Sequence, residues 1–175
     1  MKIIDLTLPM YSGMPIYPGD PESSIELIQT IDKNGWNMRR LEINSHDGTH
    51  VDVPVHANSN GKTLDDYSLE SFCGHAYIYN LDLIISSDKG IIFRDQNIDK
   101  VLADKIKKYK PKFIGLSSEY EFDTEIEKDL LKADIILFER LTNLDNLPSS
   151  FEFYGMPLNI KKGDGSPIRA FAIVN

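Results

Sequence analysis

The sequence predicts an α/β domain with a mixed sheet, whose second half follows a βαβαβ order. Short apolar runs rich in β-branched residues recur along the chain of 175 residues, whereas two segments of the second half place apolar side chains at helical spacing. Pro and Gly separate these segments at short intervals, as expected for closely connected elements. The length fits one domain over residues 1–175 with a core of its own.

The first half is predicted to be mostly extended, because its apolar runs are short and end at Pro, Gly or Asn. The expected elements are, in chain order, a strand over 3–8, a long loop over 10–21, strands over 24–31 and 38–44 around a turn at 33–35, a capped turn at 65–66 and a buried strand over 76–85. The loop holds three prolines and two glycines, which disfavour regular structure. Trp36 follows the turn, and we expect it to pack at an edge rather than to contact a ligand.

The second half alternates between segments with the two-residue period of strands and segments with the 3.6-residue period of helices. The expected elements are a helix over 98–109, a strand over 113–116, a helix over 124–132, a strand over 135–138, and strands over 151–158 and 169–174 around a plain hairpin loop at 161–166. Glu139 should then emerge at the carboxyl end of a strand, where open α/β sheets place ligand sites. Its position alone equally fits a solvated carboxylate.

Three of the four histidines lie in one run, His46-Asp-Gly-Thr-His50-Val-Asp52-Val-Pro-Val-His56. If the run is a strand, its side chains alternate between two faces. His46, His50, Asp52 and His56 then share one face, while the odd-numbered residues, three valines among them, point into the core. One face is predicted to carry the chemistry and the other to be buried.

The spacing of this run indicates a metal site. His50 and Asp52 are about 6.6 Å apart along a strand, which lets both reach one ion. His46 and His50 would be about 13 Å apart in a straight strand, so we expect a bend at Gly48. A polar loop would explain one histidine, whereas three with a carboxylate indicate Zn²⁺, Mn²⁺ or Fe²⁺. Cys73 is the only cysteine and is expected to be a small buried residue, so thiolate chemistry lacks support.

The motif His46-x-Gly-Thr-His50-x-Asp52-x-Pro54-x-His56 resembles the signature of the cyclase family of metal-dependent hydrolases, which includes bacterial kynurenine formamidases and isatin hydrolases. Three further blocks resemble the family in the same order, and they lie at 5–20, 135–144 and 163–170. The resemblance implies a swivelling β/β/α fold that assembles into a homodimer or a homotetramer.

The resemblance also implies the role of each residue in the motif. His46, His50 and Asp52 bind the first ion, and Asp52 can bridge to a second. His56 is the catalytic acid/base. Tyr17 stands where kynurenine formamidases carry a tryptophan that faces the substrate, so the resemblance implies that Tyr17 contacts the substrate.

The second ion would take Glu139 and the residue at position 127. Glu127 replaces a family histidine there, so the second site is either richer in oxygen, which favours Mn²⁺ or Mg²⁺ over Zn²⁺, or weakened or lost. Without the resemblance, Glu127 would be read as part of the solvated face of a helix.

These residues predict a hydrolase of a small amide, formamide or lactam that uses Zn²⁺ or Mn²⁺, one or two ions, with His56 moving the proton. The alternative is a degenerate member of the family that binds a metal or a small metabolite without turnover. A net charge of −8 argues against a nucleic-acid partner. The N-terminus lacks the apolar run of a signal peptide and no segment approaches 18 apolar residues, so we expect a cytoplasmic protein with no membrane contact.

Overall fold

The computed structural model describes residues 1–174. Its helices and strands are, in chain order, β1 (Lys2–Asp5), β2 (Ser24–Gln29), α1 (Ile31–Asn34), β3 (Met38–Glu42), β4 (His50–Asp52), β5 (Cys73–Ile78), β6 (Gly90–Phe93), α2 (Lys100–Tyr109), β7 (Phe113–Ser117), α3 (Thr124–Lys132), β8 (Leu137–Leu141), β9 (Ser150–Tyr154), β10 (Gly165–Pro167) and β11 (Phe171–Val174). Short 3-10 turns lie at η1 (Pro54–His56), η2 (Leu64–Asp66), η3 (Leu69–Phe72) and η4 (Leu144–Asn146).

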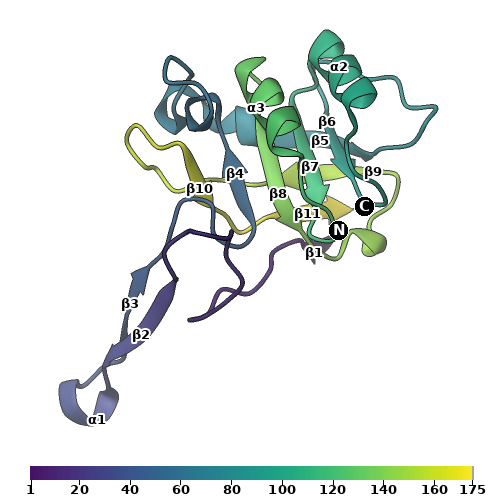
Figure 1. Cartoon of the computed structure of the whole chain (residues 1–175). Helices are drawn as coiled ribbons and strands as arrows, with labels where there is room; N and C mark the ends of the chain where they lie inside the picture. The colour runs from purple at the N-terminus through teal and green to yellow at the C-terminus, as the bar shows by residue number, and fades with distance from the viewer. Residues whose placement is uncertain (175) are drawn as a thin grey trace.

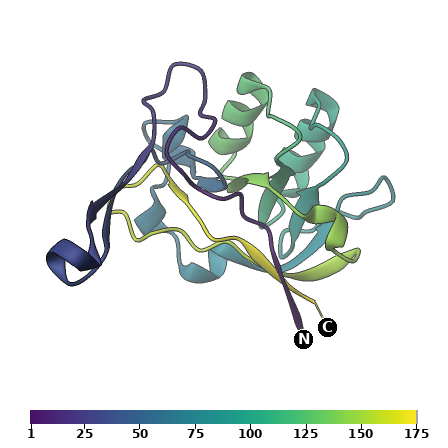
Figure 2. The ribbon, with the colours of Figure 1, turned by 90° about the horizontal axis from the view of Figure 1, so that it is seen from below.

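Within these residues, nine strands form one sheet in the order β1-β11-β9-β5-β6-β7-β8-β4-β10. The pairs β5–β6, β6–β7 and β7–β8 are parallel, while β4 pairs with β8 and β10 in antiparallel fashion. Figure 2 shows the two chain ends side by side, because β1 pairs with β11. The predicted mixed α/β class is confirmed, whereas the swivelling β/β/α assignment stays a prediction.

The sheet separates two apolar clusters. Figure 1 shows α2 and α3 together on one side of the sheet, over β6, β7 and β8, where Ile106 and Leu130 are fully buried. On the other side the strands curl round, so that the ring of Phe153 lies 5.1 Å from that of Phe113 and 4.8 Å from that of Phe138 between centroids. Both faces of the central strands are therefore covered, as parallel strands require.

Aspartate side chains cap the N-termini of α2 and α3. The helix predicted over 98–109 begins at Lys100, because the Asp99 side chain accepts a hydrogen bond from the Leu102 N–H at 2.8 Å. The helix predicted over 124–132 has those bounds, and Asp123 caps its first turn. The βαβαβ order of the second half is confirmed as β6-α2-β7-α3-β8.

Several predicted strands are shorter than expected. The strand expected over 76–85 ends at Ile78, because the chain turns at Asn80, whose side chain accepts from the N–H of Asp82. The sequence analysis did not delimit β6. The plain hairpin loop expected at 161–166 ends earlier than predicted, since Gly165 begins β10, which pairs with β4.

Strands β2 and β3 form a separate two-stranded sheet with α1 at its tip, which we call the arm (residues 24–42). Figure 1 shows the arm projecting away from the rest of the molecule. Trp36 on the arm is 63% exposed, so the prediction that it packs at an edge is wrong. Its indole N–H donates to the side-chain oxygen of Gln29 at 2.6 Å. Cys73 is also partly exposed rather than buried. Among the described residues, no helix is both long and apolar enough to cross a membrane.

Replacing Gly90 tests the packing of the central strands. A Cβ atom on Gly90 would lie 2.0 Å from Cε2 of Phe113, a fully buried ring. We expect Gly90→Ala to lower the free energy of unfolding by about 1–3 kcal/mol, because this ring would have to move within a filled core. Urea denaturation measures the change. Val101→Ala, at a side chain 79% exposed on α2, is the control and should stay within about 0.5 kcal/mol of the wild type. Equal stability of the Gly90 variant and the wild type would contradict the packing.

Candidate metal centre

A buried carboxylate holds the loop before β4. Asp47 is 3% exposed and accepts hydrogen bonds from the hydroxyl of Ser23 and from the backbone N–H of Asn44, the latter at 2.6 Å. Because Ser23 directly precedes the arm, Asp47 ties the N-terminal part of the chain to the segment that carries His46. The sequence analysis did not identify this role.

The bend expected at Gly48 is confirmed, since its φ is 61°. The bend brings the ring centroids of His46 and His50 to 5.4 Å, whereas a straight strand would keep these residues about 13 Å apart. The prediction that the whole motif forms one strand is wrong. Only β4 is extended, since the bend at Gly48 precedes it and η1 follows it. Val51 is fully buried on the opposite face, as the alternation predicts.

Asp52 lies at the centre of the site and is 1% exposed. Its Oδ1 lies 2.5 Å from Nδ1 of His46 and 3.4 Å from Nε2 of His50. Ligand atoms of these three residues lie within 4.8 Å of one another, close enough to share one ion. Nδ1 of His50 donates to the carbonyl of Gly48 at 2.9 Å, which leaves Nε2 with its lone pair facing Asp52. Metal-binding histidines typically have such a partner on the second nitrogen.

A second group consists only of carboxylates. Oxygen atoms of Asp52, Glu127 and Glu139 also lie within 4.8 Å of one another. Glu139 comes from β8, where it pairs in register with His50, and Glu127 comes from α3, which packs against η1. The expectation that Glu139 lies beyond a strand end is wrong, because β8 continues to Leu141. Asp52 belongs to both groups, which places it where a bridging ligand would be.

Burial and mutual repulsion perturb these carboxyl groups. Burial, followed by the negative charge of Asp52, raises the pKa of Glu127 to about 7 and that of Glu139 well above its usual value. Burial also opposes the ionisation of Asp52, but electrostatic interaction with His50 and the hydrogen bond with His46 outweigh it and lower its pKa to about 2. One of the three carboxylates is therefore ionised and the others hold their protons more strongly than usual.

The two inner histidines are perturbed in opposite directions. Burial lowers the pKa of His50, which keeps its imidazole neutral. Burial has the same tendency at His46, but hydrogen bonds with Asp52 and Asp164 outweigh it and raise the pKa of His46 to about 9. The proton on His46 therefore supplies the positive charge that the carboxylates face.

His56 lies beside this cluster, in η1. Its Nδ1 is 3.6 Å from Oδ2 of Asp164 and its Nε2 is 3.7 Å from Oε1 of Glu127. The same Asp164 oxygen lies 3.0 Å from Nε2 of His46, so one carboxylate faces both histidines. A Cβ atom on Gly165 would lie 2.5 Å from Cε1 of His46, which explains why only glycine fits there.

Asp164, Arg140 and Asp47 were not predicted from the sequence as parts of the site. Asp164 has a signal in its flanking glycines, Gly163 and Gly165, which permit a close approach of the backbone. Arg140 has none, because its place in the site depends on an irregularity of β8 that no local pattern reveals.

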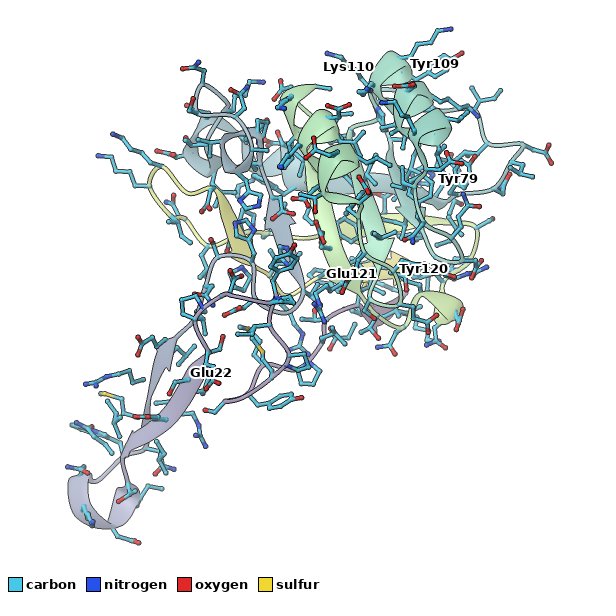
Figure 3. The ribbon with its side chains drawn as sticks, viewed as in Figure 1. Glu22, Tyr79, Tyr109, Lys110, Tyr120 and Glu121 are labelled. Atoms are coloured by element: carbon cyan, nitrogen blue, oxygen red, sulfur yellow. The ribbon has the colours of Figure 1, made fainter. Side chains whose placement is uncertain are left out.

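The candidate ligands and His56 line a cavity of about 290 Å³, and its lining includes His46, His50, Asp52, His56, Glu127 and Glu139. Apolar and aromatic side chains form much of its wall, namely Pro15, Ile16, Tyr17, Ala57, Tyr120 and Phe122. Tyr17 is 65% exposed, so it lies at the rim. Figure 3 labels Tyr120 and Glu121 in the loop that follows β7, which contributes to the same wall. The cavity can hold a small molecule against the histidine and carboxylate cluster.

The donor set fits divalent ions. Two imidazoles and a carboxylate suit Zn²⁺ or Mn²⁺, while three carboxylates suit the harder Mn²⁺ or Mg²⁺. Burial and the charge of Asp52 raise the pKa values of Glu127 and Glu139, and a bound divalent ion would favour their ionised forms. An ion held by His46 and Asp52 must displace the proton on His46, so metal and proton compete for the same place.

Comparisons with known proteins identify the family of the chain. The family model described as "Putative cyclase" matches residues 4–120. The kynurenine formamidase of Salinibacter ruber is 25% identical, over 97% of this chain and 96% of that protein. An uncharacterized protein of Methanocaldococcus jannaschii is 33% identical, over 99% of this chain and 100% of that protein.

Solved structures show the same fold. An isatin hydrolase bound to the product analogue thioisatinate superposes with a TM-score of 0.82 at 18% identity, covering 99% of this chain and 92% of that chain. Isatin hydrolase A from Ralstonia solanacearum gives a TM-score of 0.80 at 18% identity, with the same coverage. Since the family model spans more than half of the chain and a relative 33% identical spans nearly all of it, the protein belongs to the cyclase family.

Proposed function

We propose that the protein is a metal-dependent hydrolase of a small amide, formamide or lactam. The observation that carries this proposal is that two potential ligand groups share Asp52 inside a cavity, with His56 beside them. The names of the curated relatives support the reaction class, because the kynurenine formamidase of Salinibacter ruber matches along nearly its whole length.

Zn²⁺ or Mn²⁺ is the proposed cofactor, as one or two ions. His46, His50 and Asp52 would hold the first ion, and Asp52, Glu127 and Glu139 a second. A bound divalent ion supplies a Lewis acid that polarises a carbonyl group and lowers the pKa of a water molecule. An all-oxygen second group favours Mn²⁺ for the second position.

Residues of the chain carry out the proton transfers. His56 takes a proton from water and returns it to the departing nitrogen, so that amide and water become a carboxylic acid and an amine. Asp164 faces Nδ1 of His56 at 3.6 Å, where it orients the ring. Tyr17 at the rim would contact the body of the substrate.

We also propose that the chain forms a homodimer or a homotetramer. Support comes from the large apolar side chains exposed along the arm, which are Leu27, Ile28, Ile31, Trp36, Met38 and Leu41. Exposed apolar side chains gathered on one projecting element are typical of interaction surfaces.

Asp52→Asn tests the assignment of the shared ligand. We expect this variant to lose both bound metal and activity, because it removes the carboxylate that both groups use. Elemental analysis of protein purified without chelator, and again after reconstitution with Mn²⁺, measures the loss. Asp145→Asn alters an exposed carboxylate in η4 and should bind metal as the wild type does. Full metal content in Asp52→Asn would contradict the assignment.

His56→Gln separates turnover from metal binding. We expect turnover of N-formylkynurenine or isatin to fall by about 10²–10⁴, the usual contribution of general acid/base transfer, with metal content close to wild type. His75→Gln, at a histidine paired with Glu152 outside the cavity, is the control. Normal turnover by His56→Gln would remove this residue from the mechanism. Bound metal without turnover of either compound by the wild type would favour the binding-only alternative, for which the carboxylate at position 127 is the main support.

The pKa shifts predict how the metal-free protein responds to pH. The pKa of Glu127 is about 7 in the folded protein against 4.5 ordinarily, so folding takes up a proton and stability falls as the pH rises across that window. The pKa of His46 is about 9 against 6.5, so its stabilisation is complete below 6.5 and is lost as the pH rises through 9. Both effects act in the same direction, whereas the lowered pKa of His50 makes stability rise with pH below 6.5.

We therefore expect the Tm of the protein in EDTA to decrease from about pH 6.5 to about pH 9, and Mn²⁺ to reverse part of the decrease at the alkaline end. Differential scanning calorimetry measures both. Glu127→Gln should flatten the acidic part of the curve. A Tm that rises over this range in EDTA would show that the assumed protonation states are wrong.

A further inference from the structure

Strand β8 is irregular where it borders the metal centre. The pairs that bracket the irregularity are Gly115 with Phe138 and Ser117 with Leu141. One residue of β7 therefore faces two residues of β8, Glu139 and Arg140, which is the arrangement of a β-bulge. Successive side chains of a regular strand point to opposite faces, whereas here both Glu139 and Arg140 line the cavity. The bulge adds a cation to the wall beside the proposed ligand Glu139.

The backbone of Arg140 is held in a conformation that favours glycine. Its φ is 57°, in the left-handed region where a side chain causes steric strain. The hydroxyl of Thr49 donates to the carbonyl of Arg140 at 2.7 Å, and the backbone N–H of Leu8 donates to that hydroxyl at 2.9 Å. Thr49 is almost fully buried, so the surroundings impose the conformation. A strained residue held firmly at the edge of a site is typical of a functional position.

One nitrogen of the Arg140 guanidinium also lacks a hydrogen-bond partner among the described residues. Its Nε is buried and makes no hydrogen bond within residues 1–174. Lys128, another basic residue of the cavity lining, is paired with Glu125 at 2.9 Å. A buried donor without an acceptor is unfavourable, and a charged one more so. Arg140 is therefore ready to receive an acceptor that enters the cavity.

We propose that Arg140 binds an anionic oxygen group of the substrate, so that the protein prefers amides that carry a carboxylate close to the scissile bond. This inference rests on the proposed hydrolase function and names its substrate class. A guanidinium offers two parallel N–H donors that match the two oxygens of a carboxylate. Because Arg140 lines the same cavity as Glu139 and interacts with it electrostatically, the anion lies next to the reacting carbonyl. Asp20 and Glu121 line the cavity as well and disfavour an anion near themselves.

The test compares two probe amides that differ in one charge. The probes are ortho-formamidobenzoate, which carries a carboxylate beside the formamide, and formanilide, which lacks it. The variants are Arg140→Asn, because asparagine tolerates a positive φ, and Arg140→Lys, which keeps the charge but not the two-pronged donor. Lys100→Asn makes the same charge change at the exposed start of α2 and is the control.

We expect the ratio of kcat/KM for the anionic over the neutral amide to fall at least tenfold in Arg140→Asn, which corresponds to about 1.4 kcal/mol. Arg140→Lys should restore part of the ratio, and Lys100→Asn should keep the wild-type ratio. An equal loss on both amides, with the ratio unchanged, would overturn the proposal. So would a loss of bound Mn²⁺ in Arg140→Asn that accounts for the whole effect, because Arg140 would then serve the metal group.

A binding measurement tests whether Arg140 binds the anion and does not require turnover. Calorimetry on the Mn²⁺-loaded protein compares ortho-aminobenzoate with ortho-aminobenzamide, and we expect the wild type to prefer the carboxylate at least tenfold and Arg140→Asn to lose that preference. If no amide is hydrolysed but this result is obtained, the hydrolase proposal fails and the role of Arg140 stands. If both amides are hydrolysed and the preference survives in Arg140→Asn, the carboxylate is held by the ion and the role of Arg140 fails alone.

Discussion

The repulsion between the buried carboxylate of Asp52 and its half-buried neighbours Glu127 and Glu139 is the interaction on which the rest of the site depends. Asp52, Glu127 and Glu139 come from β4, α3 and β8, three elements that meet only in the folded chain. In a medium of low dielectric constant such a group is stable only if a proton or a cation neutralises part of it. The raised pKa of His46 favours its protonated form, which neutralises part of this charge, and a divalent ion would do so more completely. The repulsion lowers the stability of the metal-free protein, and metal binding raises that stability again.

The fold resists this repulsion through its backbone. Strand β4 is short but lies between β8 and β10, so hydrogen bonds on both edges fix the positions of His50 and Asp52. The loop before β4 is held by the buried carboxylate of Asp47. The close approach of β10 depends on Gly165, because any side chain there would collide with His46. Rigid elements rather than the cluster's own attractions therefore keep the ligands together.

Local patterns predicted the parts of the structure that depend on local physics. The second predicted helix agrees with α3 because its Asp123 cap and apolar spacing are contiguous in sequence, and the bend at Gly48 follows from the spacing of two histidines. Asp164 and Arg140 could not be placed in this way. Asp164 reaches His56 only because β10 pairs with β4 from a point more than one hundred residues further along, and Arg140 faces the cavity only because of a bulge against β7. Pairing between distant segments leaves little trace in either segment alone.

The arm has a practical consequence for spectroscopy. Trp36 is the only tryptophan of the chain, and it lies exposed on the arm rather than in either apolar cluster. Its indole emission therefore reports the surroundings of the arm and is insensitive to the opening of the nine-stranded sheet. A blue shift on raising the protein concentration would mean that another surface has covered the arm, and the eight tyrosines would have to serve as the optical probe of global unfolding.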